Sequence, residues 1–201
     1  LFLYSSIKII MENMRYKTIT AKIFISILVF GVIIWIGGNI VRSAIAYDLF
    51  VPGTALELKN WYSDEVRLIT VSLFRIAGFY TIIGFCMTFV SSVFLCYYLR
   101  GIYKSKGWLF MAFVLIFLAS PIEFYLMYYD IKIILAFNNE MIKSFNDQII
   151  QDYFIGRYTK LTIPATMSLL ASVSAVILAI WRPLDKNPNT QNNENKSEKF
   201  L

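Results

Sequence analysis

The chain has 201 residues, of which 58% are hydrophobic and 17% aromatic, and its formal net charge is +6 at pH 7. Only 16% of the residues are charged, and most of them lie between long apolar blocks, so the composition excludes an ordinary soluble domain and predicts a polytopic membrane protein. The basic residues are not gathered on one polar element, so we expect the lipid bilayer, and no nucleic acid, as a partner.

Histidine is absent from the sequence. This removes the usual general base, bis-histidine haem ligation and the commonest zinc ligand. The two cysteines, Cys86 and Cys96, are ten positions apart, which is about 15 Å along one helix and too far for a disulfide. We therefore expect no catalytic residue, no cofactor and no metal site.

The first membrane span is predicted at about residues 23–46, after a basic N-terminal segment, 1–22, that we place in the cytoplasm. A cleaved signal peptide is an alternative, because Ala44-Ile45-Ala46 before Tyr47 imitates a cleavage site. The apolar run is longer than a normal signal core, and Gly37 and Gly38 are more typical of helix packing.

The second span, about residues 67–99, is the longest apolar run, and Arg75 is the only ionised residue within 68–99. A helix from Asp64 to Leu99 would be about 54 Å long, whereas a hydrocarbon core is about 30 Å thick. One end must therefore project from the membrane. The preceding Ser63 is suited to cap the start of this helix.

The third span is predicted at about 108–130, and the amphipathic segment 131–158 follows it. Apolar residues in this segment recur every three to four positions, which predicts a helix that extends the bundle and packs on the projecting part of the second span. A helix lying flat on the lipid surface is the alternative. The recurring residues are Ile134, Phe137, Met141, Phe145, Ile149 and Tyr153.

The fourth span is predicted at about 159–181, and small residues share one of its faces, which favours close helix contact. These residues are Ser168, Ala171, Ser172, Ala175 and Ala179. The remaining residues, 182–201, are rich in Asn, Lys and Glu and are expected to form a disordered cytoplasmic tail. The whole is thus an all-α protein: a four-transmembrane-helix bundle, 23–181, with helices extended on the outer side.

The distribution of Lys and Arg predicts the orientation. The regions assigned to the inside (1–22, 100–107 and 182–201) hold 11 Lys and Arg, against 6 in the regions assigned to the outside (47–67 and 130–160). The positive-inside rule therefore places both termini in the cytoplasm. We expect a multi-pass protein of the cell (inner or plasma) membrane.

Counting about 1.5 Å per residue from the cytoplasmic end of each span places Glu123 about 22 Å into the hydrocarbon. An ionisable group at that depth usually faces a partner or a cavity, and Arg42 is its expected counter-ion. Near the same level lie small, polar or helix-breaking residues: Asn39, Thr166, Pro121 and Pro164. These residues form a candidate polar intramembrane site. Alternatively, Glu123 is held in a structural ion pair that fixes the helix register, or is protonated and hydrogen-bonded, with no ligand involved.

Three functions compete. The first is an accessory, assembly or scaffold component of a larger membrane complex, which binds a membrane-protein partner or forms a homo-oligomer. The second is a carrier or channel for a small solute or proton that uses Glu123. An intramembrane enzyme is the third, but Glu123, Ser91, Ser92 and the two cysteines do not assemble a recognisable nucleophile and base.

Overall fold

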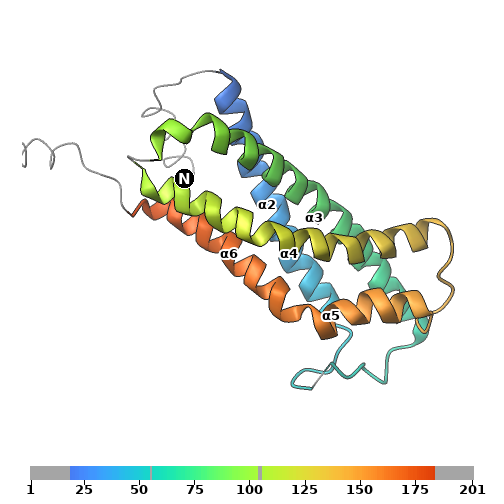
Figure 1. Cartoon of the computed structure of the whole chain (residues 1–201). Helices are drawn as coiled ribbons and strands as arrows, with labels where there is room; N and C mark the ends of the chain where they lie inside the picture. Colours follow the sequence, from blue (N-terminus) through green and yellow to red (C-terminus); the bar gives the residue numbers. More distant parts are fainter. Residues whose placement is uncertain (1–18, 55, 104–105, 184–201) are drawn as a thin grey trace, which may run out of the picture.

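The computed structural model describes residues 19–54, 56–103 and 106–183, and this part of the chain is a helical bundle. Figure 1 shows that α2 runs antiparallel to α3, and that α4 runs antiparallel to α6. The elements are α2 (Ile19–Tyr47), α3 (Asp64–Tyr98), the 3-10 turn η1 (Arg100–Ile102), α4 (Gly107–Asn138), the π-helix η2 (Ile150–Ile155), α5 (Gly156–Lys160) and α6 (Thr162–Trp181). The predicted all-α four-helix bundle is confirmed.

The two ends of the bundle differ. At one end, which we call the capped end, residues 48–54, 56–63 and 139–160 cover the helices. At the other, the open end, α3 and α4 are joined by a short connection, and the α2–α3 pair diverges from the α4–α6 pair (Figure 1).

The α2–α3 pair packs closely because glycines remove side chains from the contact. A Cβ atom on Gly84 would lie 2.6 Å from the backbone nitrogen of Trp35, and one on Gly31 would lie 2.8 Å from Oγ1 of Thr88. Gly38, for which we predicted a role in helix packing, also faces a threonine of α3, Thr81. Small residues let the two backbones approach more closely than larger side chains would permit.

The α4–α6 pair uses the small-residue face predicted for the fourth span. Ser168, Ser172 and Ala175 are buried, and Ala175 packs with Ala112 and Ile116 of α4. The prediction of close helix contact is confirmed for these three residues, while Ala171 and Ala179 are half-buried.

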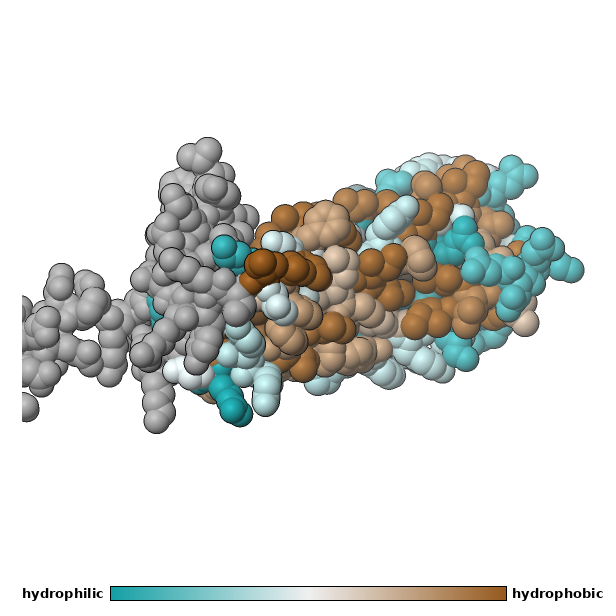
Figure 2. Space-filling view, turned by 90° about the horizontal axis from the view of Figure 1, so that it is seen from above, coloured by the Kyte–Doolittle hydropathy of each residue, from teal (hydrophilic) through white to brown (hydrophobic). Residues whose placement is uncertain are grey.

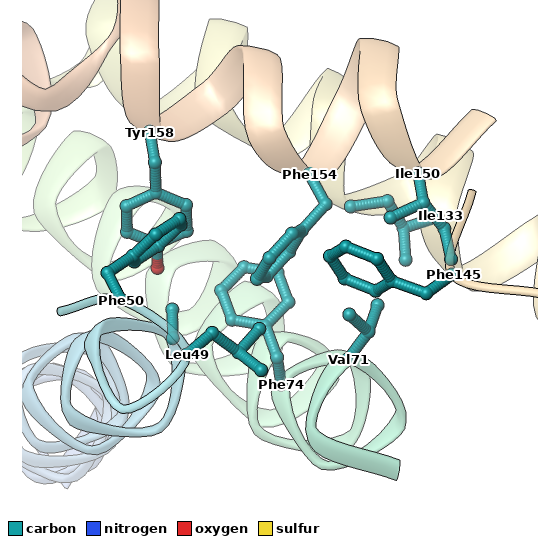
Figure 3. Packing of buried hydrophobic residues seen from close by; sticks show 10 residues of the cluster. Leu49, Phe50, Val71, Phe74, Ile133, Phe145, Ile150, Phe154 and Tyr158 are labelled. Carbon is teal, nitrogen blue, oxygen red and sulfur yellow. The ribbon is translucent and has the colours of Figure 1, made fainter. Parts of the chain in front are cut away.

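An aromatic and aliphatic core fills the capped end. The rings of Phe74 and Phe154 meet edge to face at 5.0 Å, and those of Phe154 and Tyr158 are 5.5 Å apart. Figure 3 shows these rings turned toward one another from α3, η2 and α5, beside the loop that follows α2. The buried members are Ala46, Leu49, Phe50, Val71, Phe74, Ile133, Phe145, Ile150, Phe154 and Tyr158.

The predicted helix over 131–158 forms only in part. Helix α4 continues to Asn138, but Glu140 has a left-handed φ of 53°, and residues 139–147 are not helical. In this loop Asp147 accepts hydrogen bonds from the amides of Ser144 and Lys143, which lower the pKa of its carboxyl. The segment therefore returns as η2 and α5 and packs against α3, as expected for an extension of the bundle.

The start of α3 matches its predicted cap. Ser63 accepts a hydrogen bond from the amide of Val66, and Asp64 and Glu65 occupy the first turn, where negative charge is favoured. The other helix ends differ from the predicted spans by a few residues, with the exception of α4, which continues eight residues past Asp130.

Helices α2, α3, α4 and α6 are each long and apolar enough to cross a membrane. Figure 2 shows apolar side chains over the middle of the visible face and hydrophilic ones toward the capped end. Arg75 on α3, Lys132 on α4 and Lys160, just before α6, are not buried. At about 1.5 Å per residue, they lie about 32–38 Å from the open ends of α3, α4 and α6. We call the zone between these charges and the open end the apolar layer; residues 64–74 of α3 lie beyond it.

Candidate functional site: a buried charge cluster

Three charged side chains from both helix pairs meet inside the capped end. Arg42 of α2 donates from Nη1 to Oδ2 of Asp130 on α4 at 2.5 Å, and Nε of Arg157 on α5 lies 3.5 Å from Oδ1 of the same carboxylate. The three residues are 2%, 3% and 5% exposed. We call them the charge cluster; one carboxylate thus joins two guanidinium groups that are shielded from solvent.

Neighbouring groups complete the surroundings of the charge cluster. Nη2 of Arg42 donates to Oδ1 of Asn39, one turn earlier on α2, at 2.7 Å. The ring of Phe74 lies 5.4 Å from the guanidinium carbon of Arg42 and 5.9 Å from that of Arg157. Such contacts between a cation and an aromatic face strengthen when water is excluded. Phe74 therefore links the charge cluster to the apolar core of the capped end.

Glu123 has a different partner from the one predicted. Oγ of Ser168 on α6 donates to Oε1 of Glu123 at 2.6 Å, and the two residues are 0% and 3% exposed. The prediction that Arg42 is the counter-ion of Glu123 is therefore wrong, because Arg42 pairs with Asp130. Asp130 lies seven residues after Glu123, two turns further along the same face of α4, and it is the carboxylate that reaches Arg42.

The other predicted site residues are only partly brought together. Asn39 and Thr166 line one small pocket of about 70 Å³, together with Arg157. Thr166 is exposed, and its hydroxyl donates to the carbonyl of Thr162 rather than to the charge cluster.

The two prolines do not line this pocket. Pro121 is exposed on α4. Pro164 lies in the first turn of α6, where its missing N–H leaves no helical hydrogen bond unmade.

Sequence reasoning missed Asp130 and Arg157. Asp130 stood at the predicted end of the third span and Arg157 in the amphipathic segment, so both were assigned to the outer region 130–160 and neither was considered as a partner of Arg42. The depth of each residue in its predicted span was a usable signal. Arg42 lies 19 positions after the cytoplasmic start of the first span, whereas Asp130 lies 22 and Glu123 lies 15 positions after the start of the third. By depth alone, Asp130 was at least as good a partner for Arg42.

The π-helix η2 ends at Ile155, two residues before Arg157. The amide of Gly156 donates to the carbonyl of Gln151, five residues back, which is the wide turn of a π-helix. This extra residue per turn changes the direction in which the following side chains point, and Arg157 is buried against α2 and α4. π-helical turns are frequent at functional sites.

Charge and burial determine what the site can do. Burial lowers the pKa of Arg157, repulsion from Arg42 lowers it further, and attraction to Asp130 raises it; burial likewise raises the pKa of Tyr158 to about 12. Nη1 of Arg157 is buried and has no hydrogen-bond partner among the described residues. The arrangement is suited to holding helices together and to binding an acceptor such as water beside Arg157.

No protein-family model, curated protein or solved structure matches this chain.

Proposed function

We propose that this protein is an accessory or assembly component of a larger membrane complex, and that it binds a helix of a membrane-protein partner along the exposed face of α3. The observation that supports this proposal is an apolar stripe on α3 that continues beyond the apolar layer.

The stripe consists of exposed apolar and aromatic residues with the spacing of a helix-packing seam. We call it the α3 stripe: Val66, Ile69, Leu73, Ile76, Tyr80, Ile83, Val90 and Tyr97. The spacing along the stripe alternates between three and four residues. Two positions in this series, Met87 and Phe94, carry side chains that are less exposed. This seven-residue repeat is the pattern with which one helix packs its side chains between those of another.

Lipid accounts for the part of the stripe within the apolar layer but not for its beginning. Val66, Ile69 and Leu73 lie beyond that layer and are 42%, 60% and 50% exposed. No described element covers them, so in the isolated chain they face water or headgroups. Contiguous apolar surface in that position is typical of a protein interface, and a partner helix that also projects from the membrane would cover it.

The charge cluster gives this interface a rigid base. It ties α2 of one pair to α4 of the other and to α5, directly beside Phe74 on the projecting part of α3. We further propose that the capped end is outside the cell and that both termini are cytoplasmic, in the cell (inner or plasma) membrane. The excess of Lys and Arg in 1–22, 100–107 and 182–201 supports that orientation.

The proposal is tested by affinity purification in mild detergent. We expect the wild-type protein to retain a membrane protein in stoichiometric amount, and the Ile69→Glu, Leu73→Glu double variant to lose it. Two carboxylates buried unpaired in an apolar interface should lower the yield by about ten-fold or more. Ile131→Glu is the matched control, because Ile131 is 40% exposed on α4 near the same end.

The fold of each variant is checked by its melting temperature and elution volume. Purification of wild-type protein as a monomer with no partner would contradict the proposal. If the partner were a second copy of this chain, the α3 stripe would be an interface for self-assembly and the accessory role would be rejected.

A carrier that uses Glu123 is the second candidate, supported by the burial of this carboxylate within the apolar layer. Glu123→Gln separates the two, because a glutamine carbonyl can still accept the hydroxyl of Ser168. We expect the variant to keep its melting temperature within a few degrees, since a single hydrogen bond contributes about 1 kcal/mol, and to keep its partner. If wild-type protein in proteoliposomes carried a proton or solute flux, and Glu123→Gln abolished that flux, the carrier function would instead be established.

A further inference from the structure

The divergence of the helix pairs leaves a cleft of about 310 Å³ at the open end. Three helices line most of this cleft: α2 between Ile25 and Gly37, α4 between Trp108 and Ile116, and α6 between Ser172 and Ile180. Two leucines at the end of α3 complete the lining. The lining is almost wholly apolar. A Cβ atom on Gly37 would meet nothing within 4 Å, so there is unfilled space beside α2.

The size and shape of the cleft decide between a helix and an alkyl chain. A helix is about 10 Å across with its side chains, so the 310 Å³ of the cleft can hold only about 4 Å of its length. This is less than one helical turn. An alkyl chain is about 4 Å across, because carbon atoms of neighbouring groups approach to that distance, and the same volume holds about 25 Å of it. The lining of α2 from Ile25 to Gly37 extends for about 18 Å.

The mouth of the cleft carries groups that fit a lipid headgroup. Trp108, the second residue of α4, is 1% exposed, and its indole N–H has no hydrogen-bond partner among the described residues. The guanidinium carbon of Arg182 lies 5.7 Å from the Trp108 ring. Arg100 and Lys106 precede the same helix in the sequence. A buried donor beside cationic side chains favours an anionic group with ester or phosphate oxygens.

We propose that the cleft binds one acyl chain of an anionic phospholipid, with its headgroup against Trp108 and Arg182. The chain supplies apolar contact along the lining, and an ester or phosphate oxygen accepts the indole N–H. Basic pockets between membrane helices bind anionic headgroups in this way. The site is separate from the α3 stripe and does not depend on a protein partner.

The test uses the full chain in nanodiscs of phosphatidylcholine and phosphatidylglycerol, with bound lipid counted by native mass spectrometry after transfer to detergent. We expect retention of about one phosphatidylglycerol per chain, as for a single-ligand pocket of this size. Gly37→Phe should lose most of this lipid, because its ring occupies the cleft. Ser174→Phe adds the same bulk on an exposed position of α6 and should leave it bound. Arg182→Gln should reduce the preference for phosphatidylglycerol about five-fold, the effect of one basic side chain near an anionic surface.

Three outcomes would overturn the proposal. Equal retention of the two lipids, or equal retention by the wild type and Gly37→Phe, would show only non-specific lipid around the bundle. A photo-reactive amino acid in place of Val32, which lines the cleft, should cross-link to lipid. Cross-linking to a peptide of this chain or of another protein would assign the cleft to that segment.

Discussion

Asp130→Asn is expected to destabilise the protein by about 3–5 kcal/mol, because it leaves two buried guanidinium groups without their shared counter-ion. Arg42 and Arg157 both bind this carboxylate, and all three residues are at most 5% exposed. Asp152→Asn is the control, since Asp152 is exposed on η2 and should change stability by less than about 0.5 kcal/mol. Denaturant unfolding in detergent, followed by circular dichroism, measures both.

A combined variant distinguishes the charge from the packing. Replacing Arg42 and Arg157 with Met and Asp130 with Leu removes all three charges of the cluster and keeps apolar side chains in their place. We expect it to be close to neutral or stabilising, because removing a buried ionic group as a whole avoids its desolvation cost. If this triple variant lost as much stability as Asp130→Asn, the shape of these side chains, and not their charge balance, would hold the capped end together.

Gly84→Leu is the second substitution with a large expected effect. A Cβ atom at Gly84 would lie 2.6 Å from the backbone nitrogen of Trp35, so α2 and α3 must separate. Overpacking of this kind costs about 1–3 kcal/mol and sometimes more. Gly37→Leu is the matched control, because its Cβ would be unobstructed, and removing a helical glycine should be neutral or stabilising by up to about 1 kcal/mol.

The two glycine variants are compared in the same detergent by melting temperature. Gly84→Leu should melt at a clearly lower temperature than the wild type, and Gly37→Leu should not. Similar behaviour of the two would mean that α2 and α3 do not pack with their backbones in close approach.

The helices themselves could be predicted because their signals are local. Long apolar runs mark the four candidate spans, and Ser63 with the acidic residues after it marks the start of α3. The small face of α6 predicted its buried serines and Ala175. In each case the residues that carry the signal lie within one helix, so the sequence alone contains the information.

The charge cluster could not be predicted in the same way. Its members lie on three elements, and Arg42 and Asp130 are 88 residues apart, so their pairing depends on how far each helix is shifted along its neighbour. Arg157 is placed by a π-helical turn and by the interruption after Asn138. That interruption fell in a segment whose apolar spacing favoured a continuous helix.

Cysteine labelling tests most directly whether the projecting part of α3 is exposed to water in the isolated protein and covered by a partner in the native membrane. Leu73→Cys and Val90→Cys are made separately in a background where Cys86 and Cys96 are replaced by alanine, and a membrane-impermeant maleimide is applied. With purified protein in nanodiscs, we expect Leu73→Cys to react rapidly and Val90→Cys, within the apolar layer, to stay unmodified. In native membranes Leu73→Cys should be protected. Slow reaction in nanodiscs, or equally rapid reaction in both settings, would contradict a partner bound to the α3 stripe.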